Sequence, residues 1–336
     1  MKRRALLGTL ASLAVAGCTG ANSPGTGGTT TTTATTNSPT TDPTTTDPTP
    51  TDEATPPELR ALGVPASETD CPLGDDGRAV CYPEQTDAPL SLTPASAALD
   101  LPRASTTFTL ANDTDYEYRA NFYHWRLHKR ENDDWYSVAP QMWPEPLHVL
   151  PAGESKEWSF TVDNGDAVTT GSSSESDVDL AGLGGGEYAF SVRGWFPLGD
   201  DENFHVSAGA RFELRGDPVE LTPAAGVSTT RDGDTVTVTT DAQPGEHEVM
   251  AAFVVTRSGV PPEQPLRRRI TEQLLRPGPS VDGPNPYRNT LPFFDDGAET
   301  VRFEASASEH SPFGVDDPYY LGYDGETYRV STDVLG

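Results

Sequence analysis

Between residues 89 and 214 the chain is made of short runs in which hydrophobic and polar residues alternate. Phe108 and Leu110 belong to one such run, and Tyr188, Phe190 and Val192 to another. Successive side chains of a strand point to opposite faces, so each run predicts a strand with one buried face. About seven such strands, with turn residues between them and no strong helical pattern, predict an antiparallel β-sandwich.

One alternating run changes phase in its middle. Hydrophobic residues share one phase up to Phe122 and take the other phase from Tyr123 onward. A one-residue shift within a long strand is typical of a β-bulge, which we expect at this point.

Alternation resumes in the second half of the chain, at 249–255 and 301–305. Residues 319–330 predict a hairpin that turns at Asp324-Gly325. We therefore expect two β-rich units: an entry segment followed by an antiparallel sandwich over 58–215, and a second, sandwich-like domain over 216–336.

One short helix is expected in this second domain. Leu266, Ile270 and Leu274 recur at four-residue spacing within 263–276, and Pro277 follows. This spacing is typical of an amphipathic helix, and the proline predicts where it ends.

The first eighteen residues have the pattern of an export signal. Three basic residues precede an apolar run over 5–16, which is too short to cross a bilayer because a spanning helix needs about 20 residues. The end of this segment, Val15-Ala-Gly-Cys18, resembles the lipobox of prokaryotic lipoproteins. That resemblance implies a signal peptide over 1–17 and a lipid on the Cys18 sulfur. The alternative is an ordinary signal peptide with a chance cysteine.

Residues 18–57 are rich in threonine and proline and contain almost no hydrophobic residues. Such a segment cannot bury enough apolar surface to order itself, and its composition is typical of an O-glycosylated stalk. We expect a disordered linker that holds the folded part away from the membrane.

The chain has three cysteines. With Cys18 lipidated, Cys71 and Cys81 remain as a pair in an exported chain, which favours a disulfide that closes an entry segment ahead of the sandwich. A two-cysteine metal site is the alternative, although the sequence offers no further soft ligands nearby.

Acidic residues are spread over the whole chain. The sequence has 51 acidic against 23 basic residues, a formal net charge of -28, and only three lysines. This balance excludes nucleic-acid binding, which needs a basic surface. Uniform acidity with few lysines resembles a secreted protein of a halophile, where molar salt reduces the Debye length to about 3 Å and screens the self-repulsion.

No motif for catalysis or metal binding stands out among the six histidines and three cysteines, and no Gly-x-Ser-x-Gly or Cys-x-x-Cys sequence occurs. We therefore expect no catalytic residue, metal or cofactor. Asn112 begins the only Asn-x-Ser/Thr sequence and is a candidate for N-glycosylation.

Aromatic and basic residues are the remaining candidates for binding. Trp143 lies in a predicted loop, Tyr319-Tyr320 precedes a predicted turn, and Arg267-Arg268-Arg269 is the only basic cluster after the signal. Aromatic side chains on rigid loops commonly anchor ligands, and an arginine cluster can dock an acidic partner. The alternatives are core packing for the aromatics and pairing with the protein's own carboxylates for the arginines.

Six short motifs occur in a fixed order between residues 89 and 214. They are Leu90-Ser-Leu-Thr-Pro94, Phe108-Thr-Leu-Ala-Asn112, Trp125-x-Leu127-x-Lys129, Trp135-Tyr136, Leu150-Pro-Ala-Gly-Glu-Ser155 and Gly186-Glu-Tyr188. In this order they resemble the bacterial Ig-like domains of cell-surface lipoproteins. The resemblance implies a module that binds or scaffolds and has no catalytic residues.

These observations predict a non-catalytic binding or scaffolding protein, anchored by lipid to the outer face of the cell membrane of a salt-adapted prokaryote. Its expected partner is a protein of an envelope complex. Two alternatives stay open: a lipoprotein that binds a carbohydrate or small solute, and a cryptic extracellular hydrolase.

Overall fold

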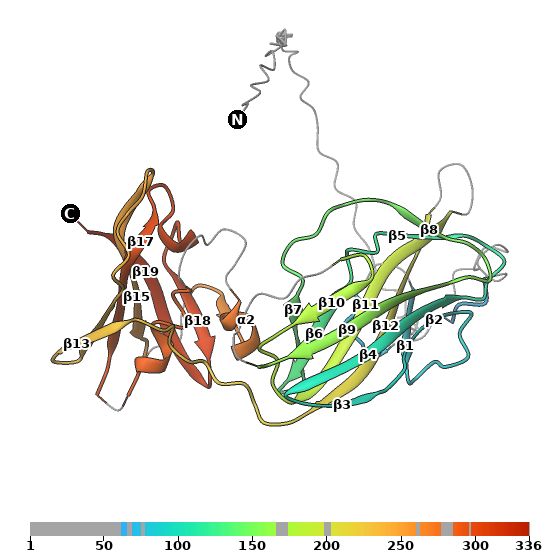
Figure 1. The fold of residues 1–336 in the computed structure, drawn as a ribbon, viewed down its shortest axis with the longest axis horizontal. Coiled ribbons are helices and arrows are strands. Elements are labelled where there is room, and N and C mark those ends of the chain that lie inside the picture. The colour runs from blue at the N-terminus through green and yellow to red at the C-terminus, as the bar shows by residue number, and fades with distance from the viewer. Residues whose placement is uncertain are drawn as a thin grey trace, which may run out of the picture. The chain divides into compact units, whose positions relative to one another are not determined.

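The computed structural model has an almost entirely β fold, as the alternating pattern predicts (Figure 1). It describes residues 62–65, 69–74, 78–165, 174–197, 203–259, 263–276, 285–295 and 297–335. The predicted signal peptide, Cys18 and the linker lie outside these residues.

Two sheets form a sandwich in the first half of the described chain. The larger sheet has eight strands among the described residues: β1 (Arg78–Tyr82), β3 (Ala98–Asp100), β5 (Tyr118–Ala120), β6 (Arg126–Glu131), β7 (Asp134–Ala139), β8 (His148–Leu150), β11 (Gly186–Pro197) and β12 (Asn203–Arg215). The smaller sheet has four: β2 (Leu90–Pro94), β4 (Arg103–Asn112), β9 (Ser155–Asp163) and β10 (Asp177–Leu180). Most neighbouring strands are antiparallel, but β1 and β3 pair with β12, and β10 with β9, in parallel.

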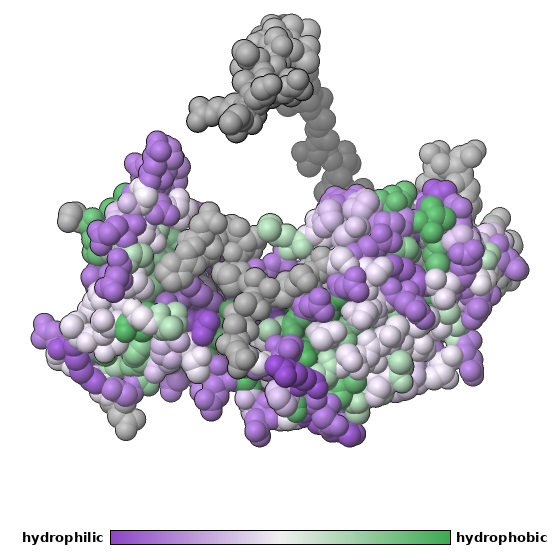
Figure 2. All heavy atoms as spheres, in the orientation of Figure 1, coloured by the Kyte–Doolittle hydropathy of each residue, from purple (hydrophilic) through white to green (hydrophobic). Residues whose placement is uncertain are grey.

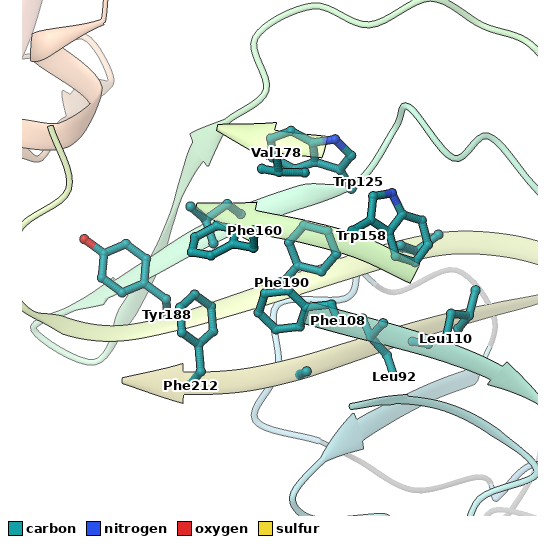
Figure 3. Packing of buried hydrophobic residues seen from close by; sticks show 14 of the residues in the cluster. Leu92, Phe108, Leu110, Trp125, Trp158, Phe160, Val178, Tyr188, Phe190 and Phe212 are labelled. Atoms are coloured by element: carbon teal, nitrogen blue, oxygen red, sulfur yellow. The ribbon is translucent and has the colours of Figure 1, made fainter. Parts of the chain in front are cut away.

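Aromatic side chains from both sheets fill the space between them (Figure 3). Phe108 of β4 stacks on Phe190 of β11 with the ring centroids 4.4 Å apart, and Phe160 of β9 meets Phe108 edge-on at 5.6 Å. All three side chains are fully buried. Burial of each such side chain stabilises the fold by about 1.5–3 kcal/mol, so this cluster holds the two sheets together.

The entry segment packs against the outer strands of the larger sheet. Cys71 and Cys81 lie at disulfide distance, with their Cα atoms 6.1 Å apart, and form a small buried cluster with Leu73. A side chain at Gly209 of β12 would meet Leu73 at 2.7 Å and the Cys71 sulfur at 3.3 Å. The missing side chain at Gly209 therefore makes room for the cysteine pair.

The second half of the chain forms one more sheet. Seven strands among the described residues lie in the order β13 (Ser228–Asp232), β14 (Thr235–Thr239), β17 (Thr300–Ser308), β15 (Glu248–Arg257), β19 (Glu326–Val334), β18 (Tyr319–Tyr323) and β16 (Leu266–Arg268). The buried side chains of this sheet, such as Phe253 and Phe303, pack with residues of α2 (Thr271–Leu275) and of two short 3-10 turns, η1 (Leu291–Phe293) and η2 (Pro312–Gly314).

The predicted hairpin at Asp324-Gly325 is present. Strands β18 and β19 are antiparallel and the turn residues have φ of 49° and 78°. Two positive φ values match the twist of the flanking strands, which explains the Asp-Gly pair.

The predicted helix over 263–276 is wrong in extent. Its first part is the strand β16, which pairs in parallel with β18, and only Thr271–Leu275 are helical. Leu266 therefore does not share a helical face with Ile270. Arg276 is extended because Pro277 follows it, as the proline predicts.

The phase shift after Phe122 is not a bulge within one strand. The chain leaves the sheet after β5 and re-enters it at Arg126 as β6, and the bulge lies between Leu127 and His128. Residues 121–125 instead form a turn, which lets both Phe122 and Trp125 reach the core.

A buried ion pair joins α2 to the sandwich. The Nζ atom of Lys129 on β6 lies 2.7 Å from Oε1 of Glu272, and both side chains are almost fully buried. The backbone N–H of Gly184 donates to the same oxygen at 3.1 Å, and the Tyr188 hydroxyl lies 3.3 Å from it. Burial and the Glu272 carboxylate raise the pKa of Tyr188 well above its ordinary value, so this hydroxyl keeps its proton.

Two further side chains, one in the middle of α2 and one directly after it, bond to the sandwich. Gln273 donates to the Ser137 carbonyl at 2.8 Å, and Arg276 donates to the Ala181 carbonyl at 2.6 Å. Together with the ion pair, these contacts tie a segment of the second half of the chain to three places on the sandwich.

The Glu272→Ala variant tests this pair, because it leaves the Lys129 ammonium buried without its main partner. We expect the free energy of unfolding to fall by about 3 kcal/mol, at the lower end for a broken buried pair because Glu131 lies 3.8 Å from Nζ. The measurement is denaturant unfolding. Lys129→Met with Glu272→Leu should recover most of the loss, since an apolar replacement removes both charges.

The matched control is Arg103→Gln, which breaks the 2.9 Å pair with Asp163 on the surface. Both side chains of that pair are exposed, so we expect little change in stability. Equal losses for Glu272→Ala and Arg103→Gln would contradict the role given to the buried pair.

Candidate binding sites

Trp143 lies on the segment between β7 and β8 and is held in place from two sides. Its indole stacks on the His124 imidazole with centroids 3.8 Å apart and planes at 12°, and the Arg126 guanidinium carbon lies 5.5 Å from its ring. Asn121 donates to the carbonyl of the next residue, Pro144, at 2.8 Å. The indole is half-buried, so Trp143 is partly packed and partly available to a partner.

His124 is uncharged at neutral pH. The distance between Arg126 Nη2 and His124 Nε2 is 2.8 Å, and since arginine only donates, Nε2 accepts. Burial first, and then the guanidinium groups of Arg126 and Arg193, lower the pKa of His124 from 6.5 to about 4. The stacked pair is therefore a neutral, flat surface with one cation beside it.

Exposed hydrophobic residues gather next to Trp143. Of the four large hydrophobic side chains that are exposed in the described part of the chain, three lie within eight residues: Met142 (68%), Leu147 (56%) and Val149 (46%). Val149 belongs to β8, an edge strand of the larger sheet. Figure 2 shows hydrophobic atoms at the end of the sheet where Figure 1 labels β8. We call Met142, Trp143, Leu147 and Val149 the β8 surface.

Tyr319 and Tyr320 have different roles. Tyr319 is buried, its hydroxyl bonds to that of Tyr287, and its ring lies 4.2 Å from the Arg267 guanidinium carbon. Burial, followed by Tyr287, raises the pKa of Tyr319 far above its ordinary value. Tyr319 is thus a core residue, contrary to the exposed role that the sequence suggested. Tyr320 is half-buried and lines, with Arg267, a cleft of about 550 Å³.

The three arginines of the basic cluster do not form one surface. Arg267 lines the cleft of Tyr320, whereas Arg268 and Arg269 line a larger cleft of about 850 Å³ with Lys129 and Glu272. Arg268 lies 3.9 Å from Asp134. Successive side chains of a strand point to opposite sides, so the strand β16 sends Arg267 and Arg268 in different directions.

Asn112 does not present an acceptor nitrogen in the folded protein. Its side chain is fully buried, and its Nδ2 donates to the carbonyls of Tyr116, Leu150 and Pro151 at 2.8–3.1 Å. Its Oδ1 accepts from the Thr114 hydroxyl at 2.6 Å. The motif that suggested N-glycosylation is a turn in which Asn112 satisfies buried backbone groups.

Within the described ranges, no group of three or more His, Cys, Asp and Glu residues is placed to hold a metal ion. The helices found in those ranges are all too short or too polar to cross a membrane.

Comparison with known proteins returned no match to a family model and none to a curated protein.

Sequence reasoning missed the partners of Trp143. His124 and Arg126 lie seventeen or more residues away in sequence, and only the turn at 121–125 and the course of the 140–147 segment bring them together. The flanking Met142 and Leu147 were a readable signal, because hydrophobic residues in a proline-rich loop have no strand or helix face to occupy.

The lowered pKa of His124 predicts a pH-dependent stability. The pKa of His128 is lowered to about 4 as well, by burial and by Arg126. Between pH 4 and 6.5 the unfolded chain then binds more protons than the folded chain, so stability is full above pH 6.5 and falls as the pH drops toward 4. His124→Gln keeps an acceptor for Arg126 and should reduce this dependence.

The measurements are the unfolding midpoint at several pH values and the NMR titration of the imidazole protons. His247→Gln is the control, because that side chain is 85% exposed, and it should leave the profile unchanged. An imidazole of His124 that titrates near 6.5 would contradict the prediction.

Proposed function

We propose that this protein is a lipid-anchored, non-catalytic binding module on the outer face of the cell membrane, and that it holds a protein of the envelope through the β8 surface. The observation that carries the proposal is that Met142, Leu147 and Val149, three of the four large hydrophobic side chains exposed among the described residues, lie within eight residues of sequence that also contain a fixed indole. Contiguous exposed apolar surface in a soluble domain is typical of an interaction site.

The charge of the chain makes this surface more distinctive. With a formal net charge of -28, most of the surface repels acidic proteins of the same environment. In molar salt, the electrostatic attraction between partners is screened beyond about 3 Å. The free energy gained by burying apolar surface is retained or becomes larger. A protein adapted to high salt therefore needs apolar contacts to bind a partner.

The composition of the β8 surface fits a protein partner. Interface cores are enriched in Trp, Met and Arg, and the β8 surface has Trp143 and Met142, with Arg126 beside the indole. The stacked His124 imidazole fixes the indole before binding, which reduces the entropy lost on association.

The N-terminal segment supports the location. The lipobox-like end at Cys18 supplies an anchor, and a linker of this composition spans the distance between membrane and binding module. The resemblance to Ig-like domains of surface lipoproteins supports a binding role over an enzymatic one. A hydrolase would be favoured instead if the purified protein turned over an esterase or glycosidase substrate.

The combined variant Met142→Gln, Leu147→Gln and Val149→Thr tests the β8 surface. These side chains are exposed, so the fold should be retained while apolar contact area is lost. We expect the yield of the crosslinked partner on intact cells in native salt to fall about tenfold or more, since a loss of 1.4 kcal/mol is tenfold in affinity. The yield is measured by quantitative mass spectrometry.

Val334→Thr is the matched control, because Val334 is 62% exposed and lies on β19 of the other sheet. It should keep the full crosslinking yield. An equal yield from the combined variant and from the wild-type chain would overturn the proposal for this surface.

The variant Cys18→Ser tests the anchor. Without a thiol there is no acceptor for the lipid, and we expect the protein to move from the membrane fraction to the medium. Immunoblots of the two fractions measure this, with Cys71→Ser as the cysteine control. Retention of Cys18→Ser in the membrane fraction would contradict lipid anchoring.

A further inference from the structure

A row of side chains crosses the solvent-facing side of the larger sheet. Val149 of β8 is paired with Arg119 of β5, and Arg119 is paired with Trp195 of β11. Trp195 is paired in turn with His205 of β12. Directly paired residues point to the same face, with Cβ atoms about 4.5–5.5 Å apart. All four side chains are exposed or half-buried, so they form one continuous line that faces solvent.

Three arginines lie on this face of the sheet. Arg193 precedes Trp195 by two residues on β11 and therefore points to the same side. Arg126 of β6 is paired with Ser191, again two residues earlier on β11, and reaches the same side. Both Arg126 and Arg193 are exposed. We call Arg119, Arg126, Arg193, Trp195 and His205 the outer-face patch.

The outer-face patch is continuous with the β8 surface at two places. Val149 belongs to the β8 surface and begins the row across the sheet. The Arg126 guanidinium carbon lies 5.5 Å from the ring of Trp143, another member of the β8 surface. The charges of Arg126 and Arg193 both lower the pKa of His124, so both guanidiniums lie near the ring on which that indole stacks. A partner that covers the β8 surface therefore contacts the outer-face patch as well.

The outer-face patch differs in charge from the rest of the chain. Acidic residues outnumber basic ones by 51 to 23 in the sequence, whereas this face carries three arginines. Glu117 pairs with Arg119. Among the residues that the structure describes, no carboxylate forms an ion pair with Arg126, whose guanidinium donates to His124. Arg126 therefore has N–H groups left for a carboxylate of another molecule.

A polypeptide fits this combined surface better than a polysaccharide does. The apolar side chains of the β8 surface need apolar side chains opposite them, which a chain of sugars lacks. Trp and Arg are also enriched among the residues that contribute most to protein–protein affinity. An arginine binds a carboxylate through hydrogen bonds of about 2.7–2.9 Å. This length is within the Debye length of about 3 Å in molar salt, so such contacts persist where long-range attraction is screened.

We infer that the envelope protein held at the β8 surface also covers the outer-face patch, where it presents an Asp or Glu carboxylate to Arg126 and apolar side chains to Trp195. This inference rests on the proposed function and adds the chemistry of the partner.

The variant Arg126→Lys tests it on intact cells in native salt. A carbodiimide joins an amine to a carboxylate without a spacer, so it links only groups in contact. After the signal the chain has two lysines, Lys129, which is buried, and Lys156, so the background is low. We expect an amide between position 126 and an Asp or Glu of the partner, at least tenfold above the wild-type yield by quantitative mass spectrometry.

Arg329→Lys is the matched control, because Arg329 is an exposed arginine on β19 of the other sheet. It should give no amide to the same partner. Equal yields from Arg126→Lys and Arg329→Lys would overturn the inference, and so would an amide to a glycan, which would make an acidic polysaccharide the occupant.

A crosslinker with a long spacer separates this inference from the proposed function. If it captures the partner with Arg126→Lys while the carbodiimide does not, the β8 surface keeps its role and the contact at Arg126 is wrong. If neither reagent captures a partner, the proposed function fails and this inference fails with it.

The variant Trp195→Ser tests the far side of the outer-face patch. We expect the yield with the long crosslinker to fall about tenfold, and Trp195→Phe to keep most of it, because the phenyl ring retains much of the apolar contact. Circular dichroism shows whether both variants are folded. A full yield from folded Trp195→Ser would show that the partner does not cover Trp195.

Discussion

The buried pair of Lys129 and Glu272 is the contact on which the arrangement of the described chain depends. Two charges removed from water are stable only when each finds its counter-charge and hydrogen bonds, and here the Gly184 N–H completes the set around the Glu272 carboxylate. This requirement fixes α2 against β6. It thereby fixes the strand β16, which runs into α2 after two residues, and with it the distribution of Arg267 and Arg268 over two clefts.

We propose that salt sets a second constraint, which acts on the surface. A chain of net charge -28 is soluble in high salt, and in that solvent long-range attraction contributes little to recognition. For the proposed function, binding then relies on short-range apolar contact at the β8 surface. The stack of Trp143 on His124 holds the indole in place before any partner arrives.

The fold was largely predictable, because strand alternation reports directly which side chains face the core. The alternation at Phe108 and Phe190 placed both residues in the core, and the Asp324-Gly325 turn placed a hairpin that the structure contains. The prediction of a helix over all of 263–276 was wrong. A three-residue strand followed by a five-residue helix happens to give hydrophobic residues the four-residue spacing of an amphipathic helix. The predictions of a glycosylation site at Asn112 and of a binding residue at Tyr319 were wrong, because both side chains are buried. A local motif or a position near a turn does not reveal burial by distant segments of the chain.

The sequence by itself determined the all-β class, since periodicity is a local property, and it favoured the pairing of Cys71 with Cys81, which the structure contains. It also identified Trp143 and Arg267 as candidate binding residues. Only the tertiary structure decided the contacts of these residues and of the buried ion pair: the His124 imidazole stacks on the Trp143 indole, the Arg267 guanidinium lies over the Tyr319 ring, and Glu272 pairs with Lys129. These partners are 19 to 143 residues apart, and contacts at such separations depend on sheet order and register, which alternation leaves open.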